Sequence, residues 1–384
     1  MTERLYYADC YLQSFDARVM EIADEGRRVY LDRTAFYPTS GGQLFDLGTL
    51  GGVAVEAVVD EEDRIAHILA GPLKAETVHG EIDWARRYDF MQQHTGQHLL
   101  SAVLEELFHF KTVSVHMGTE MSTVDIDTPS ISEEQLAMAE RRCFEVIARA
   151  VPTAITFEDA SVGRGLRKES ARTGTLRIVS INGVDRSACG GTHVRNSAEI
   201  GLVLAGKVEK IRGITRVEFV CGGRALRRAR GDNQLLAAIS RALSLPAGQA
   251  PERIAALVEQ NKSLDKERQR LATELARREG RELYLATESD ASGLRRITQQ
   301  GPIDEATRVR AQAFVAGERA IFLAISNEPP SLLFAASADS EVHAGNRVKA
   351  ALAAAGGRGG GNQTLAQGSV PDAGALERAV ALLQ

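Results

Sequence analysis

The chain is poor in cysteine and in aromatic residues. Among its 384 residues there are four Cys and one Trp, and aromatic residues make up 5% of the sequence. Four Cys spread over a chain of this length cannot form the disulfide framework of a small secreted domain. We expect Cys10, Cys143 and Cys221 to be buried small apolar residues. Cys189 differs from them because it lies in a His-containing motif.

Long apolar runs and a signal peptide are also missing. No stretch approaches the uninterrupted apolar length needed to span a bilayer, and the N-terminus lacks a basic flank followed by an apolar core. A membrane protein is therefore excluded, and a cytoplasmic location is expected by default. Hydrophobic residues make up 44% of the chain and charged residues 25%, as in soluble globular proteins. The length allows two or three domains with cores of their own.

A strong excess of positive charge is absent as well. The net charge is −5 and the sequence pI is about 6.0, so the whole molecule is not a polycation. Basic residues nevertheless gather in two stretches, which are candidate phosphate contacts or simply solvated faces. The stretches hold Arg164, Arg167, Lys168, Arg172 and Arg177, and Lys207, Lys210, Arg212, Arg216, Arg224, Arg227, Arg228 and Arg230.

Two short motifs far apart in the chain carry residue types that bind metals. His94 and His98 are four residues apart, so on a helix both imidazoles lie on one face. Cys189 and His193 flank a pair of glycines that favours a tight turn. Three nitrogens and one sulfur match a zinc site in kind and number. Thr95 stands where the helical metalloprotease motif has its catalytic Glu, so peptidase chemistry is disfavoured.

Four motifs together point to one family. They are Leu31–Gln43 (LDRTAFYPTSGGQ), 94–104 (HTGQHLLSAVL), 187–201 (SACGGTHVRNSAEIG) and Gly356–Gln367 (GGRGGGNQTLAQ). In this order they resemble the editing domain of alanyl-tRNA synthetase and its free-standing relatives, the AlaX alanyl-tRNA editing proteins, in a long form with a C-terminal domain. The resemblance covers nearly the whole chain.

The predicted architecture is α+β and multidomain. Residues 1–86 read as strands, and the resemblance implies a translation-factor-like β-barrel there. Residues 87–222 are expected to form an α+β editing domain with the zinc site, in which strands at 154–157, 176–181, 203–204 and 216–220 complete one sheet. A hairpin turning at Gly118 and a helix capped by Ser132 and Gln135 belong to the same domain.

The last part of the chain reads as helices followed by an α/β domain. In 223–280, Pro246 ends one helix and Pro251 begins another, in which Leu257, Leu264 and Leu271 fall seven apart. This spacing predicts a short coiled coil, either an antiparallel hairpin or a dimer arm. Residues 281–384 resemble the DHH-associated nucleic-acid-binding domain. Since the chain has no Asp-His-His motif, phosphoesterase chemistry is not expected.

The resemblance also implies roles for further residues. Thr34, Gly41, Gly42 and Gln43 match a motif that lies against the editing site, and Thr34 is predicted to be a pocket hydroxyl. His116 is included as a catalytic candidate, although it could equally point outward. Expected tRNA contacts are Arg212, Arg224, Arg227, Arg228, Gly359, Gly360 and Gly361. A homodimer through the helical hairpin or the C-terminal domain is a further expectation.

The function implied is zinc-dependent hydrolysis of mischarged tRNA(Ala), carrying serine or glycine. A pocket made for alanine distinguishes such amino acids by only about 1–3 kcal/mol, so errors must be removed afterwards. Because the chain begins at the β-domain, no aminoacylation activity is expected. Four protein ligands would fill a zinc tetrahedron, which leaves two alternatives open: a non-catalytic tRNA-binding protein with structural zinc, and a zinc hydrolase of small esters.

Overall fold

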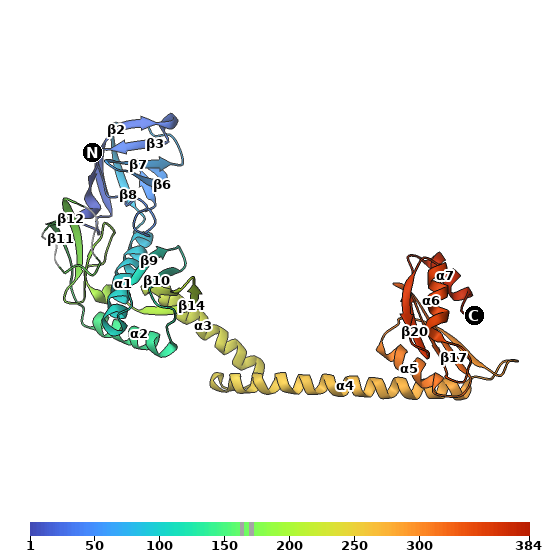
Figure 1. Cartoon of the computed structure of the whole chain (residues 1–384). Coiled ribbons are helices and arrows are strands. Elements are labelled where there is room, and N and C mark those ends of the chain that lie inside the picture. The colour runs from blue at the N-terminus through green and yellow to red at the C-terminus, as the bar shows by residue number, and fades with distance from the viewer. Residues whose placement is uncertain (162–164, 169–172) are drawn as a thin grey trace. The chain divides into compact units, whose positions relative to one another are not determined.

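The computed structural model describes residues 1–161, 165–168 and 173–384, so Arg164 and Arg172 lie outside the described residues. The chain forms two compact units, Met1–Ala238 and Ile239–Gln384 (Figure 1). Within the described parts, no helix has the length and apolar character needed to cross a membrane.

The N-terminal unit begins with a closed barrel of six antiparallel strands (Figure 1). Their order around the barrel is β2-β3-β7-β6-β5-β8. Phe15, Val29, Leu50 and Ile65 belong to the apolar cluster that fills it. Outside the ring, β1 (Glu3–Arg4) pairs in parallel with β4 (Arg33–Thr34). The barrel strands are β2 (Ser14–Ala23), β3 (Arg28–Leu31), β5 (Gly48–Leu50), β6 (Val53–Glu61), β7 (Arg64–Leu69) and β8 (Thr77–Ile82).

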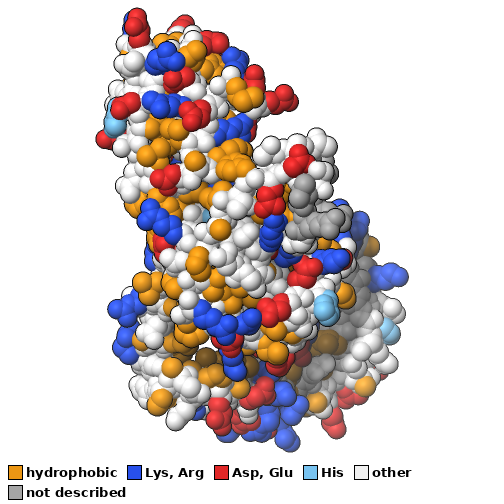
Figure 2. Space-filling model, turned by 90° about the vertical axis from the view of Figure 1, so that its left-hand side faces the viewer, with side chains coloured by type: hydrophobic (Ala, Val, Ile, Leu, Met, Phe, Trp, Pro, Cys, Tyr) orange, Lys and Arg blue, Asp and Glu red, His pale blue; other side chains and the backbone are white. Residues whose placement is uncertain are grey.

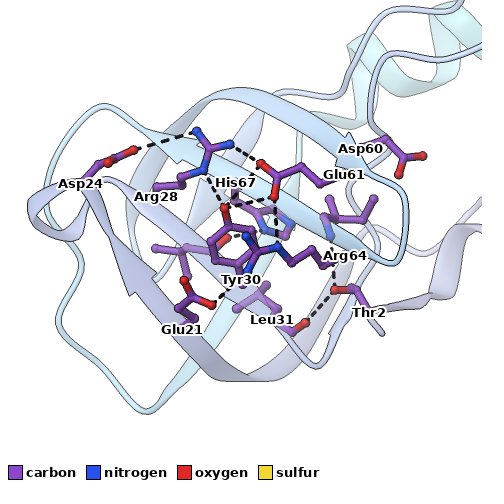
Figure 3. A network of polar contacts seen from close by, with 12 residues as sticks. Thr2, Glu21, Asp24, Arg28, Tyr30, Leu31, Asp60, Glu61, Arg64 and His67 are labelled. Carbon is purple, nitrogen blue, oxygen red and sulfur yellow. Dashed lines mark hydrogen bonds and ion pairs between the residues drawn. The ribbon is translucent and has the colours of Figure 1, made fainter.

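Charged side chains tie neighbouring barrel strands together (Figure 3). Glu61 of β6 accepts hydrogen bonds from Arg28 of β3 and, at 3.1 Å, from Arg64 of β7. Arg64 also reaches Glu21 of β2 at 2.9 Å. Its guanidinium lies over the Tyr30 ring, 4.0 Å from the centroid. Four strands are therefore joined by one polar network on this part of the barrel.

Helix α1 (Trp84–Phe108) follows the barrel and carries the first motif. Its N-cap is Asp83, whose side chain accepts a hydrogen bond from the Arg86 backbone N–H. Leu99, Val103 and Leu104 of α1 are fully buried in a cluster that also contains residues of α2 (Glu133–Ala148). Packing on this side holds the helix firmly in the domain.

Two local predictions for this domain are confirmed. Strands β9 (Thr112–Met117) and β10 (Ser122–Ile126) form an antiparallel hairpin, in which the Gly118 N–H donates to the Met121 carbonyl at 3.0 Å. Helix α2 begins with the predicted capping box. The Ser132 side chain accepts from the Gln135 N–H at 3.2 Å, and the Gln135 side chain accepts from the Ser132 N–H at 2.9 Å.

The prediction of a single sheet in this domain is wrong. The structure has a four-stranded sheet of order β14-β15-β10-β9 and a separate three-stranded sheet of order β11-β12-β13. Strand β12 already pairs with β11 on one edge and β13 on the other, so neither edge is left for β14. The remaining strands are β11 (Thr153–Asp159), β12 (Thr175–Ile181), β13 (Asp185–Ala188), β14 (Val203–Ile211) and β15 (Ile214–Cys221).

Two long helices follow, as the prolines predict. Helix α3 (Gly222–Leu243) ends before Pro246, and α4 (Ala250–Ala286) has a proline in its first turn. The heptad leucines of α4 are 36%, 59% and 50% exposed at Leu257, Leu264 and Leu271. Self-association through this exposed stripe stays a prediction.

The C-terminal unit contains a five-stranded sheet with helices on both faces. Its order is β16-β17-β18-β20-β19. One apolar cluster packs α5 against the sheet and another packs α6 and α7 against it. The elements are β16 (Arg295–Gln300), α5 (Glu305–Val315), β17 (Ala320–Asn327), β18 (Pro330–Ala336), α6 (Ala344–Ala354), β19 (Arg358–Gly361), β20 (Leu365–Ser369) and α7 (Ala373–Ala381).

The glycine-rich segment is an ordered edge strand. Gly359, Gly360 and Gly361 belong to β19, which pairs with β20 and is exposed along its length. A Cβ at Gly359 would lie 2.4 Å from the Gln367 carbonyl oxygen, so a side chain would disrupt this pairing. The segment is thus an exposed backbone surface and not a linker.

Candidate metal centre

The four predicted metal ligands lie together. His94 and His98 are one turn apart on α1, and Cys189 and His193 lie in the loop that follows β13. The candidate ligand atoms of all four residues are within 4.8 Å of one another. Cys189 Sγ lies 3.3 Å from His94 Nε2 and 3.4 Å from His193 Nε2. Residues nearly a hundred positions apart therefore converge on one point.

Two of the imidazoles are oriented by long-range contacts. His94 Nδ1 donates to Oε1 of Gln43 at 2.8 Å, and His98 Nδ1 donates to Oδ2 of Asp185 at 2.8 Å. Since Nδ1 faces an oxygen acceptor in both rings, Nε2 is in both the nitrogen that faces the cluster. Gln43 is itself fixed, because its Nε2 donates to Thr192 Oγ1 at 2.8 Å.

The third imidazole is oriented from within the first motif. Thr95 donates its hydroxyl proton to the Met91 carbonyl at 2.9 Å, so its oxygen can act only as an acceptor for the ring of His193, whose Nδ1 lies 3.2 Å away. Nε2 of His193 is again the atom turned toward the cluster. All three rings are thus held with the same nitrogen available for a metal ion.

The protonation of the cluster suits a metal. Burial alone would raise the pKa of the Cys189 thiol, but the adjacent His94 and His193 rings hold this pKa well below its usual value. Burial lowers the pKa of His193 to about 3, which keeps that ring neutral. Burial would lower the pKa of His98, but its contacts with Asp185 and Cys189 raise this pKa to about 9, so a metal ion bound there would displace a proton from the ring. The Cys189 thiolate and the imidazole nitrogens then form a donor set that can hold a metal ion.

Close backbone packing positions the Cys189 loop. A Cβ at Gly191 would lie 2.1 Å from Cε1 of His94, so only glycine fits there. Arg177 donates to the carbonyl oxygens of Cys189 at 2.7 Å and Gly191 at 2.9 Å. Because this guanidinium is 7% exposed and bonded to the loop, Arg177 is a structural clamp rather than the phosphate contact considered from sequence.

Asp185 is a site residue that the motifs did not reveal. Besides His98, it accepts hydrogen bonds from Arg167 Nε at 2.6 Å and from Ser187 Oγ at 3.0 Å. Burial would raise its pKa, but His98 and Arg167 outweigh burial and lower the pKa to about 2. An acidic residue on the strand that leads to a predicted ligand is the signal that could have indicated this role.

A cavity of about 620 Å³ opens on the cluster. Three of the four candidate ligands, His94, His98 and Cys189, contribute to its wall. Its other described lining residues include Tyr37 and Gly41 of the Leu31–Gln43 motif, Gln97 of α1 and Thr112–Val115 of β9. Four basic residues also line it: Arg4, Arg167, Lys168 and Arg177. Asp60 is the acidic residue among those described, and it pairs with Arg4 at 2.7 Å. The wall next to the cluster therefore carries net positive charge.

Comparison with known proteins agrees with this geometry. The model of the threonyl and alanyl tRNA synthetase second additional domain matches residues 176–218, which contain Asp185, Cys189 and His193. The DHHA1 domain model matches residues 306–384. The chain is 31% identical to alanyl-tRNA editing protein AlaX-L of Pyrococcus horikoshii, over 96% of this chain and 95% of that protein. The chain belongs to the alanyl-tRNA editing protein family.

Other relatives agree with this assignment. Alanyl-tRNA editing protein Aarsd1 of Mus musculus is 30% identical over 94% of this chain and 88% of that protein. The alanine–tRNA ligase of Korarchaeum cryptofilum is 31% identical over 96% of this chain, which spans 43% of that enzyme. The predicted resemblance, including the long form with its C-terminal domain, is confirmed.

The structure does not place Thr34 in the cavity. Its hydroxyl lies 2.8 Å from Nε2 of His67 and accepts from the Phe36 N–H at 3.1 Å. His67 Nδ1 lies 3.1 Å from the Val29 carbonyl, so Nδ1 carries the proton and Nε2 accepts from Thr34. Thr34 is fully buried and is not among the described lining residues. Its role as a pocket hydroxyl is therefore corrected to that of a buried hydroxyl bonded to His67 of the barrel strand β7.

The remaining catalytic candidates are the three residues that end the Leu31–Gln43 motif, which lie at or near the site, and His116, which does not. Gly41 lines the cavity, and Gly42 adopts φ 87° where its carbonyl accepts from the Met117 N–H at 3.0 Å. Gln43 orients His94. His116 is exposed and is not among the described lining residues, so the outward alternative is the one observed and a catalytic role is not supported.

The four arginines predicted to contact tRNA have different environments. Arg224 is 4% exposed and pairs with Asp89 at 2.6 Å, which corrects its assignment from nucleic-acid contact to internal ion pair. Arg212, Arg227 and Arg228 are exposed. On the face drawn in Figure 2, Lys and Arg side chains are interspersed with Asp and Glu and do not form one continuous basic surface.

Proposed function

We propose that the protein is a zinc-dependent deacylase that hydrolyses the ester of mischarged tRNA(Ala), with serine or glycine as the wrong amino acid. The observation that carries the proposal is the convergence of His94, His98, Cys189 and His193 on one point, with three of them in the wall of a basic cavity. Two relatives that align over most of their length bear the name alanyl-tRNA editing protein, which supports this substrate class.

Zinc fits the donor set. His94, His98, Cys189 and His193 would hold the ion, since imidazole nitrogen and thiolate sulfur are its preferred ligands. When bound, zinc supplies a Lewis acid that polarises a carbonyl and makes a nearby water more acidic. Gln43 and Asp185 keep two of the imidazoles oriented, so the ligands need little reorganisation.

The cavity wall suits the end of a tRNA. Lys168 and Arg167 bring positive charge into the same cavity as the metal ligands, which favours binding of the phosphates of a single-stranded acceptor end. The exposed Arg212, Arg227 and Arg228 and the open backbone of 359–361 are proposed as further contacts to the RNA. Such contacts would make binding weaken with rising salt.

The reaction serves translation fidelity. Serine adds one hydroxyl to alanine and glycine lacks one methyl, and hydrophobic pockets resolve such differences by only about 1–3 kcal/mol. A second site that hydrolyses the wrong esters and leaves alanyl-tRNA(Ala) intact removes these errors. We propose that this protein acts on tRNA already charged by another enzyme and does not itself form the ester.

One assay tests this function against its alternatives. Seryl-, glycyl- and alanyl-tRNA(Ala) are incubated with the protein, with a chelator, and with chelator followed by excess zinc. The proposed function requires loss of seryl or glycyl ester, sparing of alanyl ester, and recovery on zinc addition. Binding of tRNA without hydrolysis would favour the structural-zinc alternative. Hydrolysis of p-nitrophenyl acetate but of no aminoacyl-tRNA would favour the small-ester hydrolase.

A further inference from the structure

Gln97 occupies a distinctive place in the cavity wall. It lies on α1 between His94 and His98, and it lines the same cavity as both. The residue is 5% exposed. It contributes a neutral polar group, where the other α1 residues in the wall are candidate metal ligands.

The carboxamide of Gln97 is held in one orientation. Its Nε2 donates to Ser101 Oγ, one turn along α1, at 2.8 Å. Ser101 is fully buried and also accepts from Thr112 Oγ1 at 2.7 Å, which links the helix to β9. One N–H of Nε2 is engaged by this chain of hydroxyls, which fixes the amide and leaves Oε1 as the acceptor that Gln97 can offer to a molecule in the cavity.

Two other polar side chains of this wall are already engaged, and the hydroxyl of Tyr6, which has no partner among the described residues, is itself buried. The Tyr37 hydroxyl donates to the Ser40 carbonyl at 3.0 Å, and the Ser114 hydroxyl donates to Asp125 at 2.6 Å. Thr34, the candidate from sequence, has its hydroxyl bonded to His67. Among these groups, Gln97 is the one beside the metal ligands with an acceptor atom available.

We infer that Gln97 determines specificity by pairing with the side-chain hydroxyl of a seryl ester, an inference that rests on the proposed function. A hydroxyl donates and accepts, so it matches a fixed carboxamide. Glycyl and alanyl esters have no polar side-chain atom, and an alanyl methyl group placed there would leave the buried amide oxygen unpaired. The same residue thus favours serine and protects alanyl-tRNA(Ala).

The test compares two substrates of which only one carries this hydroxyl. Rates on seryl- and glycyl-tRNA(Ala) are measured for wild type, Gln97→Met and Ser101→Ala. Met is close to Gln in length and is a good helix former, and Ser101→Ala leaves the amide in place but removes its anchor. Gln269→Met, an exposed position on α4, is the matched control. Zinc content and thermal unfolding are recorded for each variant.

The expected result is a seryl-specific defect. Gln97→Met should lower the seryl rate by about three- to tenfold more than the glycyl rate, the range expected for one neutral hydrogen bond. Ser101→Ala should change the seryl-to-glycyl ratio in the same direction by a smaller factor, and Gln269→Met should leave it unchanged.

Equal losses on both esters, or no change in the ratio for either variant, would overturn the role of Gln97 while the proposed function stands. If Gln97→Met fails to fold, Ser101→Ala decides the same question. A wild-type protein that hydrolyses neither ester overturns the proposed function, and this inference with it.

Discussion

Nδ1 of His98 lies 2.8 Å from Oδ2 of Asp185, inside the N-terminal unit. The carboxylate belongs to the strand that leads directly into the Cys189 loop, so one contact joins the two halves of the ligand set. His94 and His193 are oriented by neutral groups, an amide and a hydroxyl. Among the three rings, His98 is therefore the one oriented by a carboxylate, a partner that strengthens an imidazole as a metal ligand.

Removing the charge at Asp185 should weaken metal binding. Asp185→Asn keeps an oxygen near His98 but loses the carboxylate, and we expect a zinc affinity lower by about tenfold or more. Competition with a chromophoric chelator measures the change. Asp159→Asn, an exposed position on β11, serves as the control and should bind zinc like wild type. Equal affinities for Asp185→Asn and wild type would remove Asp185 from the site.

Thr34 should matter for stability and not for substrate choice. Thr34→Val removes the partner of both His67 and the Phe36 N–H. We expect the free energy of unfolding to fall by about 1–3 kcal/mol, the cost of buried polar groups without partners. Urea denaturation measures this, with Thr77→Val on the exposed side of β8 as control. A changed ratio of seryl to glycyl rates would instead return Thr34 to the pocket.

His67 should make stability depend on pH. Burial lowers the pKa of His67 to about 4, whereas a His side chain in the unfolded chain has a pKa of about 6.5. Between these values the unfolded state binds more protons, so stability decreases as pH falls. The expected contribution is about 2 kcal/mol between pH 7 and pH 5. Urea denaturation of wild type and His67→Asn at both pH values measures the difference, and identical pH slopes would contradict the assignment.

Arg224 and Arg227 should respond oppositely to substitution. Arg224→Ala leaves Asp89 without its buried partner, and we expect a lower unfolding temperature. Arg227, whose side chain is 72% exposed, should tolerate Ala without loss of stability but bind tRNA(Ala) more weakly, with a shallower salt dependence. Thermal unfolding and salt titrations of tRNA binding separate the two. A stable Arg224→Ala variant with weakened tRNA binding would reverse the interpretation.

Local periodicity and spacing were sufficient to predict individual helices and the candidate metal-binding residues on them. The His94 and His98 pair followed from the helical repeat, and the capping box at Ser132 from a four-residue pattern. Whether Thr34 faces the barrel interior or the cavity depends on how distant strands close, which no local pattern records. The contact of Asp185 with His98 spans 87 residues and is equally invisible in a local pattern.

The sheets show the same limit. Strands near β12 and β14 were recognisable from apolar runs, but their division between two sheets depends on which strands their edges pair with in space. Periodicity indicates that a strand forms and does not specify its partner.

The most direct test of the account compares two histidines. Zinc content and hydrolysis of seryl- and glycyl-tRNA(Ala) are measured for wild type, His98→Ala and His116→Ala, the last an exposed position on β9 that is not among the described cavity residues. We expect His98→Ala to lose zinc and deacylation together, whereas His116→Ala retains both. Full deacylation by a zinc-free His98→Ala protein would contradict this expectation.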